Sequence, residues 1–205
     1  MTSKPTPQQI RQARAENPEA RERDFAQGLG ISEADYVAAL CGISARRIKP
    51  FGREVLGEMP KVGEVMTLTR NDSAVHETIG SYGRFMSNGG AAAALGDNIN
   101  LRLFFKHWAH GFAVEKQDGD TVRRSLQFFD PAGDAIQKIH LRPASNLPAY
   151  EALVARLLSE DQAQTVQTVP YSPLPEDLVT VESFERQDDL RVRWGAMKDV
   201  HEFHG

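Results

Sequence analysis

The sequence predicts an α+β fold, in which an antiparallel β-sheet meander is flanked by helices and joined to a small N-terminal helical subdomain. Three observations predict this class. Helical periodicity and capping residues dominate the range 8–40. Short segments separated by turn sequences fill the range 63–141, which is typical of antiparallel strands. A helical pattern of apolar residues returns over 146–159.

The N-terminal range is expected to form three short helices. Asn17-Pro18 divides the first periodic stretch in two, because proline is well suited to the first turn of a helix. Gly28 and Gly30 close the second helix. Ser32 is placed to cap the third, with Asp35 at the capping-box position.

The segment 23–40 has the outline of a helix-turn-helix, so a DNA-binding regulator is one alternative function. In such proteins the N-terminal end of the second helix contacts bases and phosphates. Here that end carries Glu33 and Asp35, whose charges repel phosphate. A structural helical corner is therefore the favoured interpretation.

The strands are expected to form a meander, because short turn sequences separate them. A weak segment of small residues, 88–94, lies among them and is not predicted as a strand. The predicted strands cover residues 65–69, 74–79, 82–86, 98–105, 108–116, 121–129 and 135–141.

The C-terminal part begins with an amphipathic helix over 146–159, followed by a polar connector that contains prolines. The chain is therefore expected to divide into three parts, which together form one structural domain. These are an N-terminal helical subdomain (1–62), the antiparallel sheet with its packing helix (63–160), and a linker with a C-terminal helix (161–205).

Composition limits the class of protein. The 205 residues carry a net charge of −4, which argues against binding to the phosphate backbone of nucleic acids. The single cysteine, Cys41, cannot form an intrachain disulfide. There is no signal-peptide pattern and no apolar run of membrane-spanning length, so no membrane insertion and a cytoplasmic location are expected.

Two histidines near the C-terminus are candidate metal ligands. His201 and His204 are three residues apart, so on a helix they share one face. Neutral imidazole is the usual axial donor to haem iron, and Trp194, Met197 and Phe203 could supply apolar surface for a porphyrin. The alternative is a solvent-exposed C-terminal tail. His107 and His110 are expected on one strand, where this spacing points them to opposite faces.

Arg102 is the second candidate. In the strand 98–105, alternation puts Leu101 and Leu103 on one face, and Arg102 and Phe104 on the other. Arg102 is then either a solvated side chain or a fixed cation that faces a ligand. Neither a nucleophile-elbow motif nor a phosphate-binding glycine-rich loop occurs in the sequence.

Taken together, several runs of sequence resemble the cytoplasmic haem-trafficking and haemin-degrading family typified by HemS and ChuS. The resemblance covers nearly the whole chain. Its members carry two similar halves, and this chain matches the first half and the start of the linker helix. The runs that carry the resemblance are residues 23–24, 29–33, 63–71, 74–77, 100–104, 107–108, 110–114 and 124–130.

The resemblance implies a function in haem uptake and iron acquisition, in which the protein delivers haem b to an acceptor, degrades it to release iron, or both. It implies that His201 is the axial ligand of the haem iron, that His204 is an auxiliary histidine, and that Arg102 is the distal arginine, which is catalytic if the protein is an enzyme. The implied partners are haem and a haem-acceptor protein such as a haem oxygenase. If a single half is the natural form, a second copy of the chain is a further expected partner. A structural module without haem is the remaining alternative.

Overall fold

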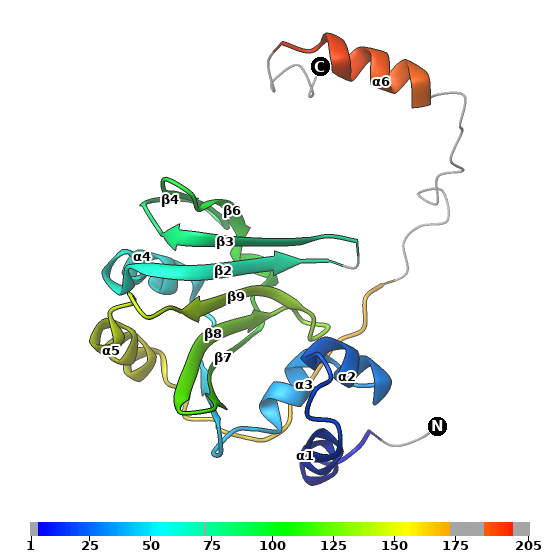
Figure 1. Ribbon diagram of the computed structural model, residues 1–205, viewed down its shortest axis with the longest axis vertical. Helices are drawn as coiled ribbons and strands as arrows, with labels where there is room; N and C mark the ends of the chain where they lie inside the picture. Colours follow the sequence, from blue (N-terminus) through cyan, green and yellow to red (C-terminus); the bar gives the residue numbers. More distant parts are fainter. Residues whose placement is uncertain (1–3, 72, 173–186, 199–205) are drawn as a thin grey trace. The chain divides into compact units, whose positions relative to one another are not determined.

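The structure, a computed structural model, describes residues 4–71, 73–172 and 187–198. The chain divides into two compact units, Met1–Pro170 and Tyr171–Gly205. The first unit is built from a six-stranded antiparallel sheet, a three-stranded antiparallel sheet and five helices, so the predicted α+β class is confirmed (Figure 1).

The six-stranded sheet has the order β1-β7-β8-β9-β2-β3. Strands β7, β8 and β9 form the predicted meander, and the tight turn between β7 and β8 places Gly119 at a φ of 58°, in the left-handed region that favours glycine. The bounds are β1 (Ala45–Ile48), β2 (Glu64–Arg70), β3 (Val75–Ser81), β7 (His110–Asp118), β8 (Thr121–Phe129) and β9 (Ala135–Leu141).

The three-stranded sheet has the order β4-β5-β6 and ends in a short 3-10 helix, η1 (Phe105–His107). Its strands are β4 (Arg84–Asn88), β5 (Ala91–Leu95) and β6 (Asn100–Phe104). The segment 88–94, which was not predicted as a strand, supplies most of β5. Its four consecutive alanines give no alternation of apolar and polar residues, so the strand leaves no period-two signal.

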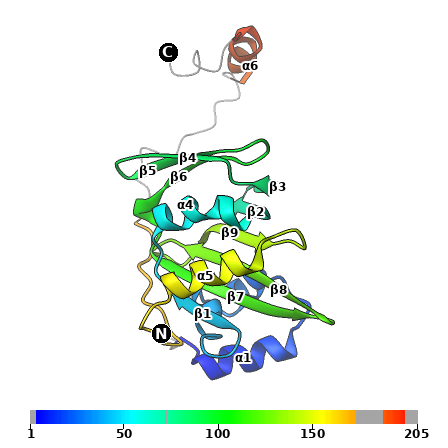
Figure 2. The same ribbon diagram turned by 90° about the vertical axis from the view of Figure 1, so that its left-hand side faces the viewer.

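Helices α4 (Gly52–Val62) and α5 (Leu147–Leu157) cover one face of the large sheet (Figure 2). Their buried residues form the main hydrophobic core with the sheet. Apolar side chains two residues apart on β8 face this layer, as strand geometry requires. Large, fully buried members of this core include Leu56, Met59, Phe128, Ile139, Tyr150 and Leu157.

Helices α1 (Pro7–Glu16), α2 (Glu22–Gly28) and α3 (Glu33–Ala38) pack with a second core cluster, which includes Phe112 and Phe129 from the sheet. The predicted capping box of Ser32 and Asp35 is present. All six residues of α3 are buried. A recognition helix needs a solvent-facing surface to enter a DNA groove, so this burial argues against the DNA-binding alternative.

Helix α3 is fixed to the sheet by charge. The Glu33 carboxylate is 5% exposed and lies 2.6 Å from Lys138 Nζ on β9 and 2.8 Å from Arg70 Nη2 on β2. Burial by itself would raise the pKa of Glu33, but Lys138 and Arg70 hold that pKa below its usual range. The carboxylate is therefore ionised at neutral pH and ties α3 to two strands.

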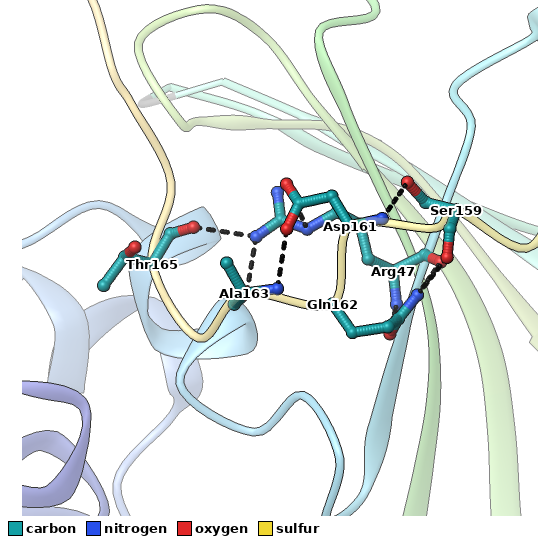
Figure 3. Close-up of polar contacts among 6 residues, drawn as sticks. All are labelled: Arg47, Ser159, Asp161, Gln162, Ala163 and Thr165. Carbon is teal, nitrogen blue, oxygen red and sulfur yellow. Dashed lines mark hydrogen bonds and ion pairs between the residues drawn. The ribbon is translucent and has the colours of Figure 1, made fainter.

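The connector that follows α5 is attached to the same body through Arg47 on β1 (Figure 3). Arg47 Nη2 donates 2.7 Å hydrogen bonds to the carbonyl oxygens of Ala163 and Thr165. Gln162 bonds to both the N–H and the C=O of Arg47. Further along, Val169 N donates to the Pro131 carbonyl at 2.7 Å, so the connector runs beside the β8–β9 turn.

The expected range of the N-terminal helical subdomain, 1–62, also contains a strand, β1, which pairs with β7 in the large sheet. The three-part division of the chain stays a prediction. In the second unit the structure describes α6 (Gln187–Ala196), on which Trp194 is 53% exposed. Among the described residues, no helix is both long enough and apolar enough to cross a membrane.

Candidate ligand-binding cleft at Arg102

Strand β6 presents Arg102 to solvent. The strand alternates as predicted: Leu103 is 6% exposed and belongs to the core, whereas Arg102 and Phe104 are exposed. In the described part of the chain, Arg102 has neither a hydrogen-bond nor an ion-pair partner, and its guanidinium is available to a ligand. Phe104, two residues away on the same face, leaves 53% of its surface uncovered.

The surroundings of Arg102 are apolar. Register places Ala93 of β5 and Met86 of β4 directly across the small sheet from it. Met86 is 42% exposed, as is Leu95 on the same outer face. A cation set in an exposed apolar surface is the combination expected for a ligand that is largely apolar but carries a negative or electron-rich group.

Arg102 also lines a cleft of about 290 Å³ where β6 and η1 meet the ends of strands in the large sheet. We call this the Arg102 cleft. Five of its ten lining residues are aromatic or aliphatic, and five are polar or charged. Its lining is Thr69, Leu101, Arg102, Leu103, Phe104, His107, Trp108, Asp130, Ile136 and Gln137.

Trp108 forms a rigid part of this wall. Its ring stacks on Phe128 at a centroid distance of 4.3 Å and meets Phe105 edge-on at 5.8 Å. The Phe105 ring in turn packs against the backbone of Gly52, at a place that a Cβ atom would occupy. Such aromatic pairs add stabilisation beyond their buried area, so the wall is held in one arrangement.

A buried polar cluster joins the small sheet to the large one next to the cleft. Thr67 and Tyr82 share a hydrogen bond of 2.9 Å between their hydroxyl oxygens, and Gln137 Nε2 donates to both hydroxyls. Burial raises the pKa of Tyr82 far above its usual value, so the phenol stays protonated. Because Tyr82 lies just before β4, this cluster orients the sheet that carries Arg102.

The expectation for His107 and His110 was wrong in one respect, since the two do not share a strand. His107 lies in η1 and is exposed at the Arg102 cleft, whereas His110 begins β7. The 3-10 turn interrupts the strand, so the period-two argument does not hold for this pair. Sequence reasoning therefore missed His107 as a cleft residue. Its aromatic neighbour Trp108, which lines the same cleft, was the available signal.

His201 and His204 lie outside the described residues, so the predicted metal ligands stay predictions. Within the described ranges, no group of three or more His, Cys, Asp or Glu side chains could hold a metal ion. What the described residues bring together is a single cleft, which Arg102, Phe104, His107 and Trp108 help to line.

Comparison with known proteins gives a consistent family assignment. Residues 30–157 match the family described as the haemin-degrading HemS/ChuX domain. The chain is 37% identical over 202 residues to the hemin transport protein HemS of Yersinia enterocolitica. That match covers 98% of this chain but 57% of HemS, so the chain spans a little over half the length of this relative.

Solved structures agree with the sequence match. Holo-PhuS, a haem-binding protein from Pseudomonas aeruginosa, superposes with a TM-score of 0.80 at 33% identity, over 98% of this chain and 59% of PhuS. The haem-degrading enzyme ChuS from Escherichia coli O157:H7 gives a TM-score of 0.76 at 27% identity, over 97% of this chain and 58% of ChuS. In both cases the similarity extends across nearly the whole of this chain.

Proposed function

This chain belongs to the haemin-degrading HemS/ChuX family, and from that premise we propose that it binds haem b in the course of haem uptake and iron acquisition. The relatives support the ligand class, because HemS is a hemin transport protein, PhuS a haem-binding protein and ChuS a haem-degrading enzyme. The proposal covers delivery of haem to an acceptor protein and degradation of haem to release iron.

The observation that carries the proposal is the Arg102 cleft. A porphyrin is a large flat apolar surface with two carboxylates and a metal centre that binds electron-rich ligands. The exposed faces of Phe104 and Met86 suit the flat surface, and the unpartnered guanidinium of Arg102 suits a negative or electron-rich group. The residues present therefore fit haem as a ligand.

In this proposal the C-terminal histidines and Arg102 have different roles. His201 would hold the haem iron through a neutral imidazole nitrogen, with His204 as an auxiliary histidine. Arg102, the expected distal arginine, would donate hydrogen bonds to a negative or electron-rich group of the bound haem. When bound, haem supplies the redox chemistry that degradation requires, while the protein binds, orients and shields it.

The cleft covers only part of such a ligand. Its volume of about 290 Å³ lies at the lower limit of pockets that enclose small molecules. A second wall would therefore be needed, and either further chain or a second copy of this chain could supply it. Delivery tolerates an open site better than degradation does, because degradation requires exclusion of water from the reacting centre.

The first test is a haemin titration of the 205-residue chain, followed by absorbance in the Soret region. The proposal predicts a saturable new Soret band at one haemin per chain. Absence of a band, or unsaturable binding like that of an unrelated protein of similar charge, would reject haem binding and favour a structural module.

A second test separates delivery from degradation. Ascorbate is added to the haemin complex under air, with and without a haem-acceptor protein such as a haem oxygenase. A Soret band that persists without the acceptor and moves to it when present indicates delivery. Loss of the Soret band with release of iron, in the absence of the acceptor, indicates degradation.

A further inference from the structure

A second and larger cavity lies away from the Arg102 cleft. It has a volume of about 480 Å³ and lies between the start of α2 and the face of the large sheet that the N-terminal helices cover. Strands β2, β9, β8 and β7 all contribute side chains to it. We call it the cationic cavity, because eight arginine and lysine residues line it against three glutamates.

The eight cations outnumber the three glutamates of the lining, although Arg123 is paired with Asp118, and Arg124 with Glu115 and Glu151, outside it. Of the three glutamates, Glu33 is shared by Arg70 and Lys138, and Glu22 lies 3.6 Å from Lys138 and 3.8 Å from Lys116. Arg21 has no hydrogen-bond or ion-pair partner among the residues that the structure describes. This concentration of cations occurs in a chain whose net charge is −4, so it is a local property of this surface.

A buried polar side chain also points to a ligand. Gln127 on β8 is 3% exposed and lines the cationic cavity. Its Nε2 donates to Ser125 Oγ at 3.1 Å, but its Oε1 has no hydrogen-bond partner in the described structure. An unpaired buried acceptor is unfavourable by itself, so a ligand that offers a hydroxyl or N–H donor would satisfy it.

We propose that the cationic cavity is a binding site for a small phosphorylated ligand that carries hydroxyl groups, of the size of a sugar phosphate. The phosphate group, with up to two negative charges and three acceptor oxygens, is matched by Arg21, Lys116 and Lys138. A ligand hydroxyl donates to Gln127 Oε1. The volume exceeds what a lone phosphate ion would fill and lies within the range of small-molecule pockets.

The site is independent of haem. It is lined from the N-terminal helices, the segment before α2 and the helix-covered sheet face, whereas the Arg102 cleft is lined from β6, η1 and the ends of other strands. The two share no lining residue among those described. Failure of one proposal therefore leaves the other unaffected.

The test is isothermal titration of the full 205-residue chain, at low ionic strength, with ribose 5-phosphate, ribose and inorganic phosphate as separate probes. Ribose 5-phosphate is expected to bind, inorganic phosphate to bind at least about tenfold more weakly, and ribose not to bind. The Arg21→Gln/Lys116→Gln variant removes two cations that lack strong partners, and is expected to weaken ribose 5-phosphate binding about tenfold.

The matched control is Lys61→Gln/Arg156→Gln, which removes two exposed cations from α4 and α5, outside the cavity. It is expected to bind ribose 5-phosphate as the unchanged chain does. Gln127→Leu should abolish the preference for ribose 5-phosphate over inorganic phosphate. Equal affinities in the two double variants, or no heat of binding with ribose 5-phosphate at millimolar concentration, would overturn the proposal.

Discussion

At the level of single residues, Arg102 is available to a ligand for two separate reasons. Side chains alternate between the two faces of a strand, and Leu103 beside it is buried in the core, so the Arg102 side chain points outward. In addition, no acidic side chain in the described structure pairs with it. A surface arginine of this kind contributes little to folding, so its substitution is informative about binding alone.

Arg102→Ala is expected to change the free energy of unfolding by less than about 0.5 kcal/mol. It is expected to weaken haemin binding about tenfold, through loss of a charged hydrogen-bond donor at the ligand. The measurement is a haemin titration beside a urea unfolding curve. Arg142→Ala, at an exposed arginine just after β9, is the control and should bind haemin normally.

His140 is a residue whose environment sets a pH dependence. Burial, with a further effect of the Lys138 cation, lowers the pKa of His140 from 6.5 to about 4, against the opposing effect of Glu22. The unfolded chain therefore binds a proton at this residue between pH 6.5 and 4, where the folded chain does not. Stability from this group is complete above pH 6.5 and is lost as the pH falls toward 4.

His140→Gln should accordingly flatten the pH dependence of stability in this range. Relative to neutral pH, the unchanged chain is expected to lose up to about 3 kcal/mol at pH 4 through His140 alone. Urea unfolding at several pH values measures the difference. The exposed His76, changed to Gln, is the control, and an identical slope in all three proteins would contradict the assignment.

At the level of elements, the predictions were correct where capping residues or turn sequences define the end of a helix or strand. The capping box of Ser32 and the turns that end β7 and β8 leave clear signals in the sequence. Strand β5 leaves none, because its alanines do not alternate with polar residues. Helix α4 has amphipathic spacing at Val55, Leu56, Met59 and Val62, but the interior Gly57 and Pro60 argue against a helix. Packing against the large sheet stabilises both elements in spite of this.

The connector 159–169 is an element without regular structure that depends largely on Arg47. The Arg47 guanidinium bonds to two of its carbonyls and lies 5.2 Å from the centroid of the Phe112 ring. Lysine keeps the charge but cannot reproduce this fork of donors. Arg47→Lys is expected to lower the free energy of unfolding by about 2 kcal/mol.

The same variant should expose the connector to cleavage in limited proteolysis and speed hydrogen exchange at Val169. Arg46→Lys on the same strand is the matched control, because Arg46 makes only half-exposed ion pairs with Glu115 and Glu151. If the two variants are cleaved at the same rate, Arg47 does not hold the connector.

At the scale of the whole molecule, the first compact unit contains the Arg102 cleft, and the range of the second unit includes His201, the predicted iron ligand. The fold class and the outward placement of Arg102 could be predicted from the sequence, because both follow from short-range periodicity. The cleft could not, because it depends on contacts between β6, η1 and β9. The cleft also has His107 in its lining beside Arg102. The alternation expected along a strand had excluded His107 and His110 as a pair of ligands for one metal ion.

That arrangement makes the identity of the haem ligand the central question. The most direct measurement compares Soret spectra and haemin affinities of the unchanged chain, His201→Ala and His107→Ala. We predict that His201→Ala loses the original Soret maximum and binds haemin at least about tenfold more weakly, whereas His107→Ala keeps both properties. An unchanged spectrum in His201→Ala, with the loss found in His107→Ala instead, would contradict the account.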